Sequence, residues 1–371
     1  MNDKKLRAGI IGCGGIANAK HLPALAKLTD RIEVVAFCDI IEQKAFMARS
    51  KFGPEDSIVI KDYKELLKDD SIDVIYVLTP NMAHSHITVD ALKAGKHVLC
   101  EKPMAATSDD ARKMLDAAKT SGKKLTIGYQ NRFRRDSQMM YQVCRNGELG
   151  DIYFSKAHAL RRRAVPTWGV FMDKEKQGGG ALIDIGTHAL DLVLWMTDNY
   201  KPVSVTGSVY KKMADQNKGN IFGPWDPEKF DVEDSAFGFI KMENGATVYL
   251  EASWVLNITD VREAKCTICG TRGGAEMLGS NPMVSNLVIN GEKYGNLIET
   301  TPQTTGGVAY FSGAKETEAD VEARQWLDAV VYDKEPVVKP EQAYVVTQIL
   351  EAIYDSAKSG KTITFERRDA K

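Results

Sequence analysis

The chain has 371 residues, which exceeds the length that a single hydrophobic core usually stabilises, so two domains are expected. Its 49 lysines and arginines nearly balance its 50 aspartates and glutamates, which leaves a net charge of -1 and no field that would attract nucleic acid or an anionic membrane. A composition of 43% hydrophobic and 27% charged residues excludes the disordered and fibrous classes. The expected partner is a small molecule.

The six cysteines show no pattern of metal ligands or disulfides. Cys266 and Cys269 form a lone Cys-x-x-Cys in a strand-like stretch without a second pair, so we interpret them as structural and expect no metal. The first residues contain neither a secretory apolar region nor a membrane span. We therefore expect a cytoplasmic protein with no membrane partner.

Residues 1–126 alternate between apolar strands and amphipathic helices. The expected strands are Leu6 to Ile11, Ile32 to Cys38, Ile58 to Ile60, Val74 to Leu78, His97 to Cys100 and Lys124 to Ile127, and the expected helices are Ala17 to Leu28, Ile41 to Phe52, Tyr63 to Lys68, His84 to Ala94 and Ser108 to Ser121. Strands joined by helical crossovers are parallel, so this pattern predicts a doubly wound α/β Rossmann domain. Its ligand should lie beyond the carboxyl ends of the strands.

Residues 127–371 change to longer alternating stretches, typical of antiparallel strands with one covered face. They predict an α+β C-terminal domain with a large, mostly antiparallel, open-faced sheet. An open sheet face is a common oligomer surface, so we expect a homodimer or homotetramer formed through it. Residues 211–231 read as a long loop, and Glu341 to Lys358 as a late helix that ends at Gly360.

A glycine-rich turn between the first strand and the first helix predicts dinucleotide binding. It matches Gly-x-Gly-x-x-(Gly/Ala), with candidate contacts Gly12, Gly14, Gly15, Ile16 and Ala17. Glycines permit the tight turn and close approach of backbone amides to a pyrophosphate, which the positive end of the helix also favours. Asp39 ends the second strand 22 residues after Ala17, where a carboxylate accepts bonds from ribose hydroxyls and repels a 2'-phosphate. NAD is therefore favoured over NADP, although a plain turn residue at Asp39 is the alternative.

Polar residues after later strands extend the predicted cofactor site. Thr79, Pro80 and Asn81 follow the fourth strand and lead to His84, which turn and capping roles leave unexplained. Glu101 and Lys102 directly follow the fifth strand, and Gln130 follows the last one. We expect all of these residues to contact the cofactor.

The motifs GCGGIA, CDI, TPN, EKP, GYQNRF and GGGALIDIGTHALDLVLW occur in this order along the whole chain. In them the chain resembles the glucose-fructose oxidoreductase, inositol dehydrogenase and rhizopine-catabolism family, called Gfo/Idh/MocA. The resemblance implies a Rossmann domain followed by an open-sheet domain, NAD or NADP as hydride carrier, an active site between the domains, and a sugar or cyclitol substrate. It also implies catalytic roles for Lys102, Asp184 and His188 and a cis peptide bond before Pro103.

The residue types agree with that chemistry. Oxidation of a secondary alcohol needs a base for the hydroxyl proton and a cation that stabilises the alkoxide, roles that suit His188 and Lys102. Asp184 lies four residues before His188 on one face of a helix-compatible stretch, and it can orient the imidazole, hold Lys102 or bind a sugar hydroxyl. A buried Asp-His bond that only stabilises a helix is the alternative.

Other residues are candidates for binding the sugar. Arg132 lies near the nicotinamide end of the predicted site, while Arg161 and Trp168 lie in the loop before Gly178, where an indole could stack on a pyranose. Asp184 and His188 complete this predicted set.

The favoured function is an NAD-dependent dehydrogenase acting on CH-OH groups of sugars, sugar derivatives or cyclitols, of the class EC 1.1.1. One alternative is a redox-neutral enzyme that cleaves glycosides through a transient keto-sugar with tightly held NAD. A catalytically silent NAD-binding sensor is the other, and the presence of Lys102, Asp184 and His188 disfavours it.

Overall fold

The computed structural model describes residues 5–279, 287–302 and 316–366. The chain forms two compact units. The first comprises Met1–Phe133 and Ala314–Tyr344, and the second Arg134–Gly313 and Val345–Lys371. Within the described parts, no helix combines the length and the apolar character that a membrane crossing requires.

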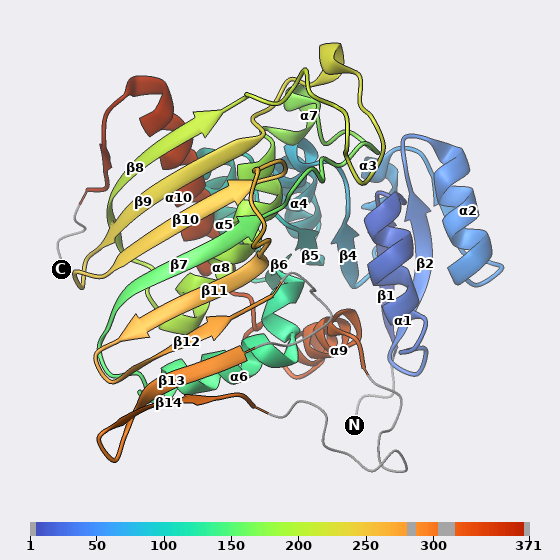
Figure 1. Ribbon diagram of the computed structural model, residues 1–371. Coiled ribbons are helices and arrows are strands. Elements are labelled where there is room, and N and C mark those ends of the chain that lie inside the picture. Colours follow the sequence, from blue (N-terminus) through green and yellow to red (C-terminus); the bar gives the residue numbers. More distant parts are fainter. Residues whose placement is uncertain (1–4, 280–286, 303–315, 367–371) are drawn as a thin grey trace. The chain divides into compact units, whose positions relative to one another are not determined.

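The first unit is built on a six-stranded parallel sheet (Figure 1). Its strands are β1 (Leu6–Ile11), β2 (Ile32–Cys38), β3 (Ile58–Ile60), β4 (Val74–Val77), β5 (His97–Glu101) and β6 (Leu125–Gly128), in the order β3-β2-β1-β4-β5-β6. The order reverses between β1 and β4, and ligands of such sheets bind at that reversal, beyond the carboxyl ends. The predicted doubly wound parallel sheet is confirmed.

The helices of this unit follow the predicted pattern, with one local change. They are α1 (Leu22–Leu25), α2 (Glu42–Phe52), α3 (Tyr63–Leu66), α4 (His84–Lys93), α5 (Ser108–Ser121) and α9 (Glu318–Val331), with short 3-10 turns η2 (Asn81–Ala83) and η3 (Gln130–Phe133). The predicted helix from Ala17 to Leu28 instead opens with a π turn, η1 (Ala17–His21). Such turns are frequent at functional sites.

Helix α9 belongs to the first unit although it lies late in the sequence. Its Trp326 and Leu327 are buried in the same core as Leu22 and Leu25 of α1. Two ion pairs, Lys27–Asp320 and Arg31–Asp328, each 2.7 Å long, reinforce the contact. The compact units therefore differ from the division predicted at residues 126/127, because the apolar face of α9 is covered by the Rossmann core.

The second unit contains a nine-stranded sheet. Its strands are β7 (Ile152–Leu160), β8 (Pro202–Tyr210), β9 (Ser235–Met242), β10 (Thr247–Ser253), β11 (Glu263–Gly270), β12 (Gly273–Met277), β13 (Leu287–Lys293), β14 (Asn296–Thr300) and β15 (Ile363–Thr364), in the order β14-β13-β12-β11-β7-β10-β9-β8-β15. Only the β7–β10 pair is parallel in this part of the described chain. The mostly antiparallel sheet is thus confirmed.

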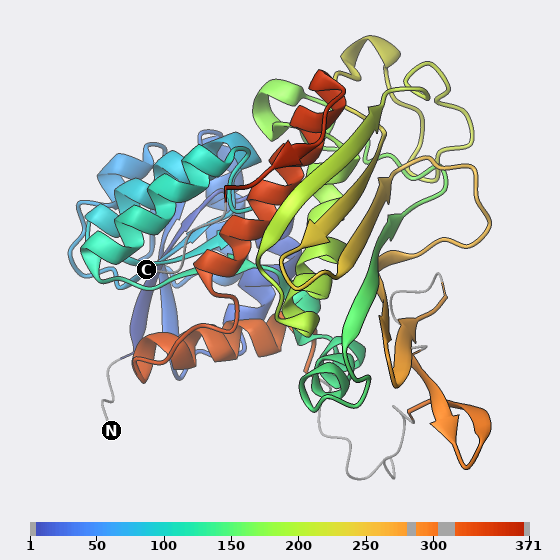
Figure 2. The same cartoon turned by 90° about the vertical axis from the view of Figure 1, so that its left-hand side faces the viewer.

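Helices cover one face of this sheet. The helical segments are α6 (Arg135–Arg145), α7 (Lys174–Gln177), the π turn η4 (Leu182–Gly186), α8 (Thr187–Thr197), the 3-10 turn η5 (Pro227–Lys229) and α10 (Pro340–Ser359), which begins in the first unit. Figure 2 shows α8 and α10 on the same side, while the other face carries no helix among the described residues. Glycines let α10 pack closely, since a Cβ at Gly207 would lie 2.6 Å from the Ile353 carbonyl oxygen. The predicted open face is present.

Candidate functional site

The turn after β1 has the geometry that a dinucleotide cradle needs. Gly12 has φ +95°, and a Cβ there would lie 2.5 Å from the Leu78 carbonyl oxygen, so only glycine fits. Around Gly14 and Gly15 nothing lies within 4 Å of an added Cβ, which leaves space in front of the backbone. Ala17 is completely buried against the core. These features fit a pyrophosphate approaching the start of η1.

Asp39 is fixed to this turn through both carboxylate oxygens. Its Oδ2 accepts from the Cys13 N–H and its Oδ1 from the Ile41 N–H, each at 2.9 Å. Each oxygen keeps a second lone pair, so the carboxylate can still accept bonds from ribose hydroxyls. Ile40 beside it is 80% exposed and offers no positive charge to a 2'-phosphate.

His84 lies behind the predicted cofactor loop rather than in it. Its ring is completely buried, with Nδ1 2.8 Å from the Pro103 carbonyl oxygen and Nε2 2.9 Å from that of Thr79. Burial lowers the pKa of His84 despite these two carbonyls, and a neutral ring has one N–H to donate. His84 ties the segment after β4 to the segment after β5. Its predicted contact with the cofactor stays a prediction.

The other residues predicted after β4 keep some exposure. Thr79 and Asn81 are half-buried, and Pro80 is exposed. They stand at the sheet edge that the strand order assigns to ligands. The peptide bond between Lys102 and Pro103, after β5, is cis, as the resemblance implies.

Glu101 is buried and holds the backbone of Lys102. Its Oε2 accepts from the Lys102 N–H at 3.0 Å, while Lys20 Nζ and His21 Nε2 contact its Oε1 at 2.7 and 2.8 Å. Burial alone would raise the pKa of Glu101, but Lys20 and His21 hold it well below its usual range. Glu101 therefore positions the backbone of Lys102, and its predicted contact with the cofactor stays a prediction. Lys102 itself is half-buried.

Gln130 and Arg132 lie on η3, directly after β6. Gln130 is half-buried, and its Oε1 accepts from Lys20 Nζ at 3.3 Å. Arg132 is completely buried, and its Nη1 donates to the Val337 carbonyl oxygen at 3.1 Å and to Gln342 Oε1 at 2.7 Å. Its guanidinium thus fastens the segment after α9, and its contact with a sugar stays a prediction.

In the second unit, Asp184 and His188 lie on consecutive helical segments. Asp184 belongs to the π turn η4 and His188 to the first turn of α8, so the predicted helix is present with a widened start. Both side chains are 8% exposed. The Nε1–H of Trp254 donates to Asp184 Oδ2 at 3.1 Å. Sequence reasoning assigned Trp254 no role; its position just after β10 was the available signal.

A buried carboxylate also fixes the glycine run before η4. Glu233 accepts from the N–H groups of Gly180 at 2.7 Å and Leu182 at 3.0 Å, and from the Tyr354 hydroxyl at 2.8 Å. A Cβ at Gly180 would lie 2.0 Å from the Glu233 carbonyl oxygen. The glycines therefore permit close approach to Glu233, which holds the backbone at the start of the turn that carries Asp184.

Arg161 and Trp168 lie in the loop after β7. Arg161 forms a two-pronged contact with Glu263, from Nε at 2.6 Å and Nη2 at 2.5 Å. Burial alone would lower the pKa of Arg161, but Glu263 and the nearby charge of Asp184 raise it. Trp168 is 52% exposed and packs edge-on against Phe222 from the 211–231 loop, with ring centroids 4.8 Å apart. Both side chains stay candidates for sugar binding.

Cys266 and Cys269 lie three residues apart on β11, where they point to opposite faces and cannot share a ligand. Among residues 5–279, 287–302 and 316–366, no three His, Cys, Asp or Glu side chains gather in a way that could hold a metal ion.

Comparison with known proteins agrees with both units. Residues 6–129 match the model of an oxidoreductase family with an NAD-binding Rossmann fold, and residues 142–365 match the C-terminal α/β domain of the same family, Gfo/Idh/MocA. D-glucoside 3-dehydrogenase of Escherichia coli K12 is 35% identical over 363 residues, covering 98% of each chain. Inositol 2-dehydrogenase of Salmonella typhimurium is 32% identical over 202 residues, covering 54% of this chain and 57% of that one.

Solved structures share the fold over nearly the whole length. Levoglucosan dehydrogenase, determined in complex with NADH and L-sorbose, superposes with a TM-score of 0.83 at 22% identity, covering 97% of this chain and 99% of that one. At that identity the likeness concerns the fold alone. The two family matches show that this chain belongs to the Gfo/Idh/MocA family of oxidoreductases with an NAD-binding Rossmann domain.

Proposed function

We propose that this chain is an NAD-dependent dehydrogenase that oxidises a secondary ring hydroxyl of a D-glucoside. Full-length similarity to a D-glucoside 3-dehydrogenase supports this substrate class over inositols, since the inositol 2-dehydrogenase match spans about half of each chain. The observation that carries the catalytic assignment is the buried bond from the Trp254 indole to Asp184, four residues before His188.

Gly12 to Ala17, Asp39 and the segment Thr79 to Asn81 would hold the dinucleotide. The space above Gly14 and Gly15 suits its phosphates, and the anchored carboxylate of Asp39 suits the adenosine ribose. The absence of a cation at Ile40 and Ile41 supports NAD over NADP. When bound, NAD supplies the hydride acceptor.

The chain's own groups manage the proton and the charge of the substrate. We assign His188 as the base that takes the proton of the reacting hydroxyl, since imidazole exchanges protons near neutral pH. Lys102 supplies the positive charge that stabilises the developing alkoxide. Asp184, oriented by Trp254, holds the imidazole or an adjacent hydroxyl in place, while His84 and Glu101 fix the backbone on either side of Lys102.

We assign sugar selection to two loops of the second unit, the loop after β7 and the loop of residues 211–231. Asn220 joins them, because its Oδ1 accepts from the Val165 N–H at 2.8 Å and its Nδ2 donates to the Val165 carbonyl oxygen at 3.0 Å. The exposed indole of Trp168 offers an apolar face for a pyranose, and Arg161 offers N–H donors beyond those used by Glu263. We further propose a homodimer or homotetramer formed through the open sheet face.

A substrate panel tests the proposal. Purified protein is mixed with NAD and, in separate reactions, methyl glucosides, free aldoses, inositols and sugar acids, and NADH absorbance is followed while the product is identified by mass spectrometry. The proposal expects NADH to form fastest with glucosides, with one keto-glucoside per NADH. Faster turnover of an inositol would contradict the substrate class, and glycoside cleavage without net NADH would contradict the net reaction.

A further inference from the structure

A buried charge cluster links four separate segments of the first unit. Its members are Lys20 of η1, Glu101 at the end of β5, Gln130 of η3 and Glu322 of α9. Lys20 Nζ lies 2.7 Å from Glu101 Oε1, 2.8 Å from Glu322 Oε2 and 3.3 Å from Gln130 Oε1. An ammonium group has three N–H donors, so three acceptors match it.

Burial of these charged groups costs desolvation free energy. Lys20, Glu101 and Glu322 are 8%, 4% and 5% exposed, and apolar side chains often replace such buried ion pairs without loss of stability. Stability alone is therefore a weak reason for the cluster. The geometry of the cluster indicates a different purpose, because two of the three acceptors, Glu101 and Gln130, lie in segments of the predicted cofactor site.

The contacts lead directly to Lys102. Glu101 uses Oε1 for Lys20 and His21 and Oε2 for the backbone N–H of Lys102, so a displaced ammonium would leave Oε1 with His21 alone and would allow the carboxylate to turn. A Cβ at Gly128 would lie 2.8 Å from Glu101 Oε1, and glycine there makes the space for the carboxylate. The Lys102 backbone is thus held through Glu101, and Glu101 is held by Lys20 together with His21.

The same ammonium sets the orientation of Gln130. Because Oε1 of the amide accepts from Lys20, the amide nitrogen with its two N–H donors is directed away from Lys20. Gln130 is a predicted cofactor contact, and a fixed amide would present donors rather than an acceptor. One buried lysine therefore arranges two elements of the site together.

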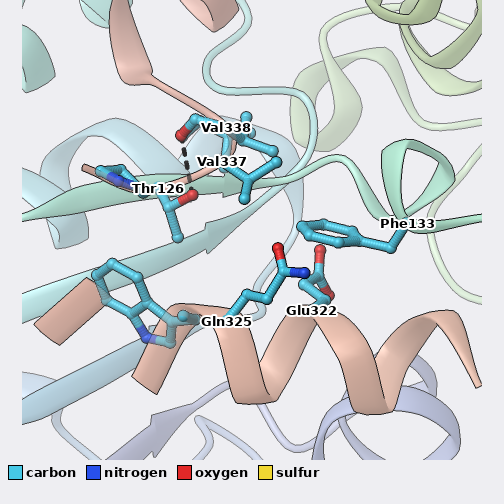
Figure 3. A pocket seen from close by; sticks show the side chains of 9 residues that line it. Thr126, Phe133, Glu322, Gln325, Val337 and Val338 are labelled. Carbon is cyan, nitrogen blue, oxygen red and sulfur yellow. Dashed lines mark hydrogen bonds between the residues drawn. The ribbon is translucent and has the colours of Figure 1, made fainter. Parts of the chain in front are cut away.

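Helix α9 supplies the remaining anchor. Figure 3 shows the Glu322 side chain on α9 beside Gln325 and Phe133, at a pocket that Thr126, Val337 and Val338 also line. The Thr126 hydroxyl donates to the Val338 carbonyl oxygen at 2.9 Å, which ties the segment after α9 to β6. Glu322 therefore comes from a helix that is itself fastened to the sheet.

We propose that Lys20 and Glu322 are positioning residues for hydride transfer, which hold Lys102 through Glu101 and set the amide of Gln130. The catalytic meaning of this inference rests on the proposed function. Glu322 is the better residue to change, since its removal leaves Lys20 and Glu101 as a balanced buried pair.

The test compares Glu322→Ala, Glu322→Asp and Glu322→Gln with the control Asp328→Asn. Asp328 also joins α9 to the first unit, through Arg31, but lies outside the cluster. The glutamine of Glu322→Gln keeps the side-chain length and an acceptor for Lys20. The aspartate of Glu322→Asp keeps the negative charge, but its shorter side chain moves the carboxylate away from Lys20. We expect kcat with NAD and a methyl glucoside to fall about tenfold to a hundredfold in Glu322→Ala, less in Asp, and about threefold or less in Gln and the control.

The dissociation constant of NAD separates positioning from binding. We expect it to change by no more than about threefold in each variant that folds, while kcat falls. An unchanged kcat in Glu322→Ala would overturn the proposal, as would loss of NAD affinity as large as the loss of kcat. So would a Glu322→Asp variant that matches the wild type while Glu322→Gln does not. If Glu322→Ala fails to fold, the comparison of kcat between Glu322→Asp and Glu322→Gln tests the proposal.

Hydrogen exchange of the Lys102 amide, followed by mass spectrometry of peptides spanning residues 98–106, needs no substrate. The proposal expects faster exchange in Glu322→Asp or Glu322→Ala than in Asp328→Asn, because the bond from Lys102 to Glu101 opens more often. Equal exchange would overturn it. A wild type that forms no NADH with any glucoside would refute the proposed function, and the exchange rates would still decide the positioning inference.

Discussion

Replacing Trp254 with phenylalanine removes the indole N–H that donates to Asp184 and keeps an aromatic ring in the buried position. A hydrogen bond to a charged group contributes about 1.5–3 kcal/mol. If that bond orients Asp184 equally in the transition state, its loss corresponds to a fall in kcat of roughly tenfold to a hundredfold. Trp254→Phe is therefore expected to bind NAD normally and to turn over slowly.

The assay is steady-state NADH formation at saturating NAD and methyl glucoside, with urea unfolding of the same preparations. Trp195→Phe is the matched control, since Trp195 is a buried indole of α8 that stacks on Tyr141, with centroids 4.3 Å apart, two turns beyond His188. Both variants lose packing and should lose stability. An equal fall of kcat in the two, or none in a folded Trp254→Phe, would refute the orienting role of the indole.

Three further predictions concern other parts of the chain. Asp39→Ala should weaken NAD and bring the dissociation constants of NAD and NADP closer, because the charge that repels a 2'-phosphate is gone; an unchanged ratio measured by fluorescence titration would contradict this. Gly180→Ala should lower the free energy of unfolding in urea by about 1–3 kcal/mol, since the new Cβ meets the Glu233 carbonyl. Burial raises the pKa of Cys13 and Cys38 to about 12, so at about pH 8 roughly one thiol in ten thousand is ionised; alkylation followed by mass spectrometry should be slow until urea unfolds the chain.

Local patterns were sufficient to predict the first sheet. The strand from Leu6 to Ile11 and the strand from Ile32 to Cys38 have the predicted bounds, because buried parallel strands are continuous apolar runs set off by glycine and polar residues. The turn at Gly12 was likewise predictable from the glycine itself, since the backbone conformation there excludes other side chains. Features decided within about ten residues were predictable.

Features that depend on residues far away in the sequence could not be predicted. The contact of Glu322 with Lys20 spans 302 positions in the sequence, and nothing near either residue indicates it. The same holds for Arg132, whose partners Val337 and Gln342 lie 205 and 210 positions away in the sequence. Burial decides whether a charged side chain meets a ligand or the chain itself, and pattern alone does not report burial.

The site residues of the second unit show the intermediate case. Asp184 and His188 stand out by spacing and by resemblance, yet no motif in the sequence indicates Trp254, which lies 70 positions from Asp184. The π turn that carries Asp184 could not be predicted from a helical period of 3.6 residues, because a widened turn keeps the same apolar residues in the sequence. The distant partners of a candidate catalytic residue can be named only once the fold is known.

The most direct test of the account compares His188→Ala with the wild type for NADH formation from NAD and a methyl glucoside, with the NAD dissociation constant measured on the same samples. The account predicts that turnover falls to background while NAD binds as in the wild type, since His188 takes the hydroxyl proton and holds no part of the dinucleotide. Turnover that persists in a folded His188→Ala variant would contradict the account.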